Sequence, residues 1–110
     1  MEIDYRKNKL RKQCNSASEI KRAFGTRAKK VSDRLDEITS SPSLAVLMQI
    51  PAANCHPLKA DKAGEWAVDI SGNFRIIFEI ADDPVPIKED GSIDTALVTK
   101  VMIIEIDDYH

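Results

Sequence analysis

The sequence predicts an α+β domain in which N-terminal helices pack on a small, twisted antiparallel β-sheet. In the first half, apolar residues recur at steps of three and four through residues 20–38, which is the spacing of one helix face. From residue 65 onward they recur at every second position, as in strands with one buried face. The helical segments precede the strands and do not alternate with them, so the order favours α+β over α/β. A chain of 110 residues has the size of one domain, which we expect to span residues 1–110.

In the N-terminal half, a weak alternation predicts a short strand over residues 1–6, and residues 8–14 form a short basic helix. Ser16 and Glu19 have capping-box spacing and predict a helix that begins at residue 17. Gly25 costs about 1 kcal/mol relative to Ala inside a helix, and it marks close packing or a break. The apolar stripe of this helix covers about five turns and comprises Ile20, Phe24, Ala28, Val31, Leu35 and Ile38.

The C-terminal half begins after Pro42, which cannot continue the helix, and a short helical turn capped by Ser43. Residues 51–64 are predicted as a loop. Two strands over residues 65–71 and 74–80 are joined by Gly72-Asn73, residues that tolerate the positive φ of a tight hairpin. A long polar connection over residues 81–95 leads to a last strand, residues 97–106. This strand is apolar at nearly every position, which predicts that both of its faces are covered.

Composition restricts the class of protein. Apolar residues make up 43% and charged residues 31%, as in a globular chain, and no apolar run has the length of a membrane span. The start of the chain has no signal-peptide pattern, and Cys14 and Cys55 stand apart, so a reducing cytoplasm is expected. Two Cys and two His are too few for a zinc site, and no nucleotide-binding glycine motif occurs. We therefore expect no metal and no cofactor.

Charge is distributed unevenly along the chain. Residues 1–34 hold eleven Lys and Arg against four acids, a net +7, whereas residues 35–110 carry −9. A basic N-terminal third on an acidic body suggests a side that faces a polyanion such as nucleic acid. The alternative is that these cations only solvate the outer faces of helices.

The side chains suited to proton transfer are few and gather around the predicted sheet. His56 and Lys59 precede the first hairpin strand, Arg75 lies on the second, and Tyr109 and His110 end the chain directly after the last strand. Cleavage of a phosphodiester by a 2′-hydroxyl needs a base, an acid and cations for the phosphate, and this set supplies all three. Each residue also has a structural interpretation. His56 and Lys59 can be ordinary loop residues, Arg75 can pair with Asp69 across the hairpin, and the chain end can be frayed.

Three stretches resemble the HigB-type toxins of the RelE/ParE superfamily, the proteic killer family. They are H-P-L-K-A-D-K-A-G-E-W, G-N-F-R-I-I-F and the terminal D-D-Y-H, in the family's order over residues 55–110. The resemblance implies helices packed on a twisted antiparallel sheet. It places His56, Lys59, Arg75, Asp108, Tyr109 and His110 on the family's active-site positions. It implies phosphate contacts for Lys59 and Arg75, and proton transfer or nucleotide orientation for His56, Tyr109 and His110.

The same resemblance implies an activity and partners. It implies a bacterial toxin that cleaves mRNA in the ribosomal A site without a metal, and that is neutralised by a helix-turn-helix antitoxin of the HigA type. Operator DNA would be contacted only through that antitoxin. Two alternatives stay open. One is a ParE-like poison of a protein target such as DNA gyrase, because a fold alone does not define an activity. The other is a degenerate member that only binds its antitoxin and acts as a co-repressor, suggested by Ser71 and Glu65 where some active members carry other residues.

Overall fold

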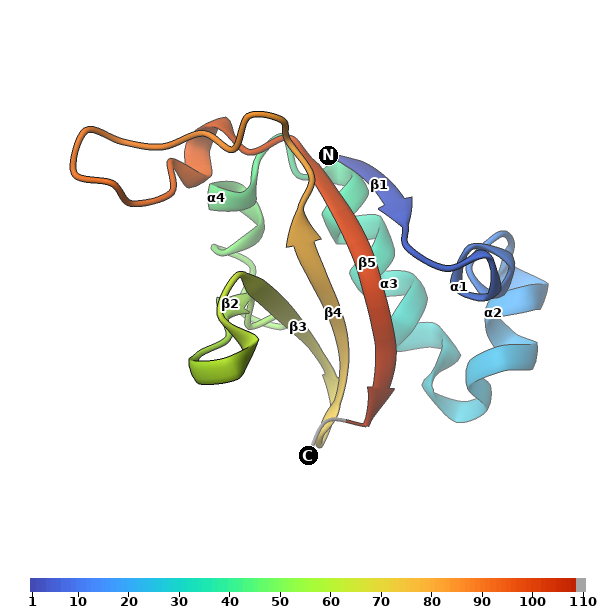
Figure 1. Ribbon diagram of the computed structural model, residues 1–110. Coiled ribbons are helices and arrows are strands. Elements are labelled where there is room, and N and C mark those ends of the chain that lie inside the picture. The colour runs from blue at the N-terminus through green and yellow to red at the C-terminus, as the bar shows by residue number, and fades with distance from the viewer. Residues whose placement is uncertain (109–110) are drawn as a thin grey trace.

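The computed structural model describes residues 1–108 and consists of helices packed against a five-stranded sheet. The strands are β1 (Glu2–Tyr5), β2 (His56–Pro57), β3 (Glu65–Ser71), β4 (Phe74–Ile80) and β5 (Lys100–Asp108), in the spatial order β1-β5-β4-β3-β2. Figure 1 shows the helix α3 (Ala28–Ser40) lying across one face of the sheet. The predicted α+β class is confirmed.

The sheet is mixed, and the prediction of a purely antiparallel sheet was wrong. β1 pairs in parallel with β5, with Ile3 opposite Val101 and Tyr5 opposite Ile103, while the other ladders are antiparallel. The partner of β1 lies almost a hundred residues away in the sequence, so no local turn signal reveals its direction. The parallel pairing is possible because the chain that connects β1 to β5 contains all the helices and is far longer than the dozen or so residues that a parallel connection needs.

The long predicted helix is divided into two. Ser16 caps α2 (Ala17–Phe24) by accepting a hydrogen bond from the Glu19 N–H at 3.2 Å, as the capping box predicts. The chain then turns at Gly25, where φ is +57° and ψ is −122°, into a 3-10 turn, η1 (Gly25–Arg27), before α3 begins. Only glycine adopts these angles readily, so the continuous apolar stripe spans two helices joined at a break.

Two shorter helices complete the N-terminal half. They are α1 (Asn8–Gln13) and α4 (Leu44–Leu47), and the hydroxyl of Ser43 accepts a hydrogen bond from Val46 N–H at the start of α4. Two further 3-10 turns, η2 (Ala60–Lys62) and η3 (Thr95–Leu97), lie in the connections before β3 and before β5. None of the described helices has the length and apolar character that a bilayer crossing requires.

β3 and β4 form the predicted hairpin, with Gly72 at φ +54° in the turn. β5 extends to Asp108, past the predicted end at residue 106, because it continues to pair with β4 until Phe74. The apolar run of β5 does not reflect helices on both faces. Val101, Ile103 and Ile106 enter the core, whereas Met102 and Ile104 are only half-buried.

The core lies between the helices and the face of the sheet that they cover. Its fully buried members include Val31 and Ile38 of α3, Leu44 and Leu47 of α4, and Val68, Ile76, Phe78 and Ile103 of the sheet. These are the stripes that the two periodicities predict. The core therefore fixes which strand positions point away from the helices, and those positions carry the candidate site.

Candidate functional site

The face of the sheet turned away from α3, called the open face below, holds two neighbouring rows of side chains, of which Ala67 and Ile77 are buried. Across the strands, one row consists of His56, Ala67, Ile77 and Glu105, and the next consists of Asp69, Arg75 and Asp107. Residues directly opposite on paired strands share a face, so His56 and Arg75 lie on the same surface. They are separated by two strand spacings across the sheet and by one two-residue step along it, which together amount to about 12 Å.

His56 is held in one tautomer. Its Nδ1 lies 2.6 Å from the carbonyl oxygen of Asn54. Because a carbonyl oxygen only accepts, the neutral ring carries its proton on Nδ1 and a lone pair on Nε2. A fixed Nε2 lone pair is what a general base at a hydroxyl group requires.

Asp69 joins His56 to Arg75 through a short chain of contacts. One carboxylate oxygen of Asp69 accepts from Asn54 Nδ2 at 2.8 Å, and the other lies 3.4 Å from Arg75 Nε. The backbone of Asp69 is anchored as well. Its N–H donates a hydrogen bond to the carbonyl oxygen of Ala53, and its own carbonyl oxygen accepts one from Nε of the buried Arg34 at 2.7 Å. The ion pair that sequence reasoning offered as the structural interpretation of Arg75 is therefore present.

The remaining predicted site residues lie around this network. Lys59 is exposed in the connection between β2 and η2. Asp108 is opposite Phe74 in the ladder, so it belongs to the other face of the sheet from Arg75. Tyr109 and His110 lie outside the described residues. The assignment of these side chains to one active site stays a prediction.

Carboxylates dominate the charge of the open face. Arg75 has Asp69 as its ion-pair partner on β3 and Asp107 opposite on β5. Further along β4, Glu79 pairs with Arg6 at 2.6 Å. An anionic ligand would therefore have to compete with Asp69 for Arg75. Among residues 1–108, no group of three or more His, Cys, Asp or Glu side chains could hold a metal ion.

The cysteine beside the candidate base is chemically quiet. Cys55 is buried, and burial raises the pKa of its thiol to about 12, so the thiol stays protonated at neutral pH. Burial likewise raises the pKa of Tyr5, on the far edge strand. Neither group is suited to transfer a proton near pH 7.

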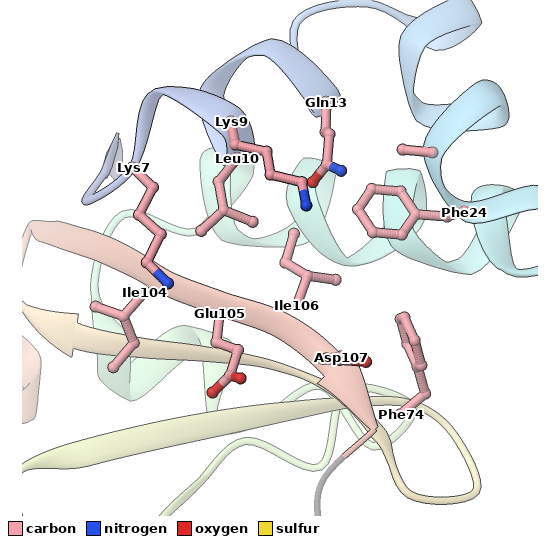
Figure 2. Close-up of a pocket in the computed structure, with 11 residues that line it drawn as sticks. Lys7, Lys9, Leu10, Gln13, Phe24, Phe74, Ile104, Glu105, Ile106 and Asp107 are labelled. Carbon is pink, nitrogen blue, oxygen red and sulfur yellow. The ribbon is translucent and has the colours of Figure 1, made fainter.

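A hollow of about 320 Å³ lies beside β5, between that strand and the helices α1 and α2. Figure 2 shows Lys7 and Lys9 on its helical side, Glu105 and Asp107 on its strand side, and the rings of Phe24 and Phe74 at one end. The two rings meet edge to face, with centroids 6.3 Å apart. Cations and carboxylates are balanced here, and none of His56, Lys59 and Arg75 lines this hollow.

Sequence reasoning missed Asn54 as a site residue and treated Asp69 only as a partner for Arg75. Asn54 adopts a positive φ of 45°, a conformation that asparagine tolerates better than most residues. That conformation directs its carbonyl to His56 while its amide reaches Asp69. The only available signal was an asparagine two residues before the histidine, which is too common a pattern to single out.

Comparison with known proteins supports the architecture. A solved structure of a YoeB/ParE toxin from Agrobacterium tumefaciens is similar over 100% of both chains, with a TM-score of 0.56 and 13% sequence identity. At this identity the similarity concerns the fold alone. No protein-family model and no curated protein matches the chain.

Proposed function

We propose that the chain is a toxin of the RelE/ParE type that stops translation by cleaving mRNA on the ribosome. The observation that carries the proposal is the fixed tautomer of His56 on the same open face as Arg75. The toxin-like fold and the three sequence stretches of the HigB type support it. The partners in this proposal are the ribosome, mRNA and a helix-turn-helix antitoxin. Operator DNA is contacted only through that antitoxin.

In the proposed reaction, His56 Nε2 removes the proton of a 2′-hydroxyl, whose oxygen then attacks the adjacent phosphorus. The bond from phosphorus to the 5′-oxygen breaks, leaving a 2′,3′-cyclic phosphate and a 5′-hydroxyl. Arg75 and Lys59 stabilise the charge on the phosphate, and the phosphate replaces Asp69 as the partner of Arg75. The proton for the leaving oxygen comes from Tyr109 or His110. No step requires a metal.

A second candidate function is a ParE-like poison of a protein target such as DNA gyrase. The observation that favours it is the acidity of the open face, where Asp69 already pairs with Arg75 and Asp107 lies opposite. Such a face repels RNA but suits a basic protein surface. A chain that only binds its antitoxin would neither cleave mRNA nor poison a protein target.

Induced expression in a bacterial host separates these functions. The nuclease predicts that incorporation of labelled methionine falls before that of labelled thymidine, and that Arg75→Ala and His56→Gln both relieve the arrest. A gyrase poison predicts that DNA synthesis and plasmid supercoiling fail first. Continued growth with well-folded protein would leave only the antitoxin-binding role.

A further inference from the structure

The outer surface of the helices carries two adjoining hollows without a carboxylate among their lining residues. One, of about 420 Å³, lies between the start of α3 and the β3–β4 hairpin and is lined by Thr26, Arg27, Lys29, Lys30 and Ser71. The other shares Thr26 and Lys29 with it and adds Lys21 from α2. We propose that these hollows bind phosphates of an RNA backbone, with Arg27 and Lys30 as the principal cations.

The break at Gly25 creates this surface. Because α2 ends there and η1 turns the chain, Thr26 and Arg27 lie beside the hairpin residue Ser71. Two hydroxyls thus converge with the cations on one hollow. Hydroxyls and cations are the groups that most often contact nucleic-acid phosphates.

Arg27 is held in position before any ligand arrives. Its guanidinium carbon lies 4.5 Å from the centroid of the Phe74 ring, and Phe74 is only 8% exposed. Stacking on a buried ring restricts the side chain, while its N–H edges stay available for the paired hydrogen bonds that a phosphate accepts. Less conformational freedom is then lost on binding.

Arg27 and Lys30 are also the cations of the first hollow whose charge is not neutralised, and Lys21 of the second hollow likewise forms no ion pair with a described residue. Lys29 pairs with Asp33 at 3.2 Å, and Arg22 of α2 pairs with Glu19 at 3.3 Å. Within residues 1–108, neither Arg27 nor Lys30 forms an ion pair. An anion therefore meets two uncompensated charges in this hollow, whereas on the open sheet face it meets carboxylates.

The hollow lies at the end of the molecule where the candidate cleavage site lies. Phe74, under Arg27, is next to Arg75 in β4, and it pairs with Asp108 near the end of the chain. In Figure 1, the hairpin, the end of β5 and the beginning of α3 gather at this end of the sheet. An RNA strand whose backbone lies on Arg27 and Lys30 thus passes the hairpin close to Arg75. The choice of RNA as the polyanion rests on the proposed function. The charge and shape of the hollow are observed independently of that function.

The test measures binding of a fluorescent 2′-O-methyl oligoribonucleotide of about 12 nucleotides, which the proposed reaction cannot cleave, by anisotropy over a range of salt concentrations. The double variant Arg27→Ala/Lys30→Ala is compared with Lys88→Ala/Lys100→Ala, which removes the same charge at the opposite end of the sheet. We expect the first to weaken binding about tenfold or more and to reduce the slope of log K against log salt by about 1.4, the value for two single-strand phosphate contacts. The second should change neither quantity appreciably. Equal losses in both double variants, or no loss in the first, would overturn the proposal.

Lys30→Glu serves as a second variant, because this side chain is exposed and its replacement should leave the packing of Phe74 intact. It should weaken binding more than Lys30→Ala. Co-sedimentation with purified ribosomes, measured for the same variants, distinguishes ribosomal RNA from free message as the source of the phosphates. If the protein binds the oligonucleotide through Arg27 and Lys30 but does not affect translation, the phosphate site stands and the nuclease function is rejected. If the protein arrests translation but its RNA binding does not change in the Arg27 and Lys30 variants, the nuclease function stands and the phosphate site is rejected.

Discussion

Asp69 links the candidate base to the candidate phosphate-binding arginine, and it does so with a single carboxylate. Its two oxygens contact Asn54 and Arg75, and Asn54 in turn orients His56. Such a chain both positions the imidazole and holds Arg75 on the sheet. The geometry of the candidate site therefore depends on a residue that carries no catalytic signature in the sequence.

Replacing Asp69 by Asn tests this dual role. The variant keeps an oxygen for Asn54 but removes the charge that pairs with Arg75. We expect the free energy of unfolding to fall by about 1 kcal/mol, while RNA binds several-fold more tightly because Arg75 is released. Chemical denaturation and anisotropy measure the two effects. Binding that weakens in parallel with stability would show that Asp69 does not restrain Arg75.

The sequence indicated the candidate groups of the site but not the contacts between them. His56 and Arg75 were predicted from their chemistry and from the stretches of the HigB type, and the ladder places both on one face. Asn54 was missed because its role depends on a left-handed backbone conformation and on a residue fifteen positions further along the chain. Contacts of this kind depend on how strands pair, which composition and spacing do not encode.

Elements were predicted well where the signal is local and less well where it is not. The Ser16 cap and the Gly72-Asn73 hairpin lie where the spacing predicts them. The division of the long helix at Gly25 and the parallel direction of β1 differ from the simplest interpretation. An apolar stripe has the same period whether one helix or two carry it, and a four-residue strand contains no information about its distant partner.

Gly25→Ala distinguishes the break from a tolerated glycine in a helix. Helix propensity alone predicts that alanine stabilises the chain by about 1 kcal/mol. The observed angles predict the opposite, a loss of roughly 1 to 3 kcal/mol, because a Cβ is strained there although no atom obstructs it. Thermal unfolding gives the sign. A more stable variant would mean that α2 and α3 join in solution.

The long connection between β4 and β5 is tied to the sheet by one carboxylate. Asp82 accepts hydrogen bonds from the N–H groups of Thr99 and Lys100 and from the Thr99 hydroxyl, all between 2.9 and 3.1 Å. Burial alone would raise the pKa of Asp82, but these hydrogen bonds outweigh it and lower the pKa below its ordinary value of 3.8. The segment carrying Ile87 and Leu97 is thus anchored at its base.

This anchor predicts a pH dependence with a definite sign. Because the pKa of Asp82 is lower in the folded state, its stabilisation is complete well above pH 3.8 and is lost as the pH falls through the folded pKa. Asp82→Asn should therefore be about 1 to 2 kcal/mol less stable than the parent at neutral pH. The difference should shrink as the pH falls below 3.8. Denaturation curves at several pH values measure it, and a difference independent of pH would exclude the ionised carboxylate as the cause.

Charge divides the whole molecule into two surfaces. Most cations of the basic N-terminal third lie on the helices, and the acidic remainder supplies the carboxylates of the open sheet face. The sequence predicted the imbalance but not its consequence. Several of the cations, Arg34 among them, are used in ion pairs, and those that remain near the hairpin lie across it from Arg75. In the proposed function, the cations for RNA binding and the groups for cleavage thus come from different parts of the fold.

In the proposed function, His56 acts as a base in cleavage of ribosome-bound mRNA. Primer extension on a defined message, with purified ribosomes and the chain, tests it most directly. We predict cleavage only when ribosomes are present, and a rate reduced by roughly 100-fold or more in His56→Gln, whose melting temperature stays close to that of the parent. Cleavage by His56→Gln at the rate of the parent, or an intact message where the parent protein stops translation, would contradict the account.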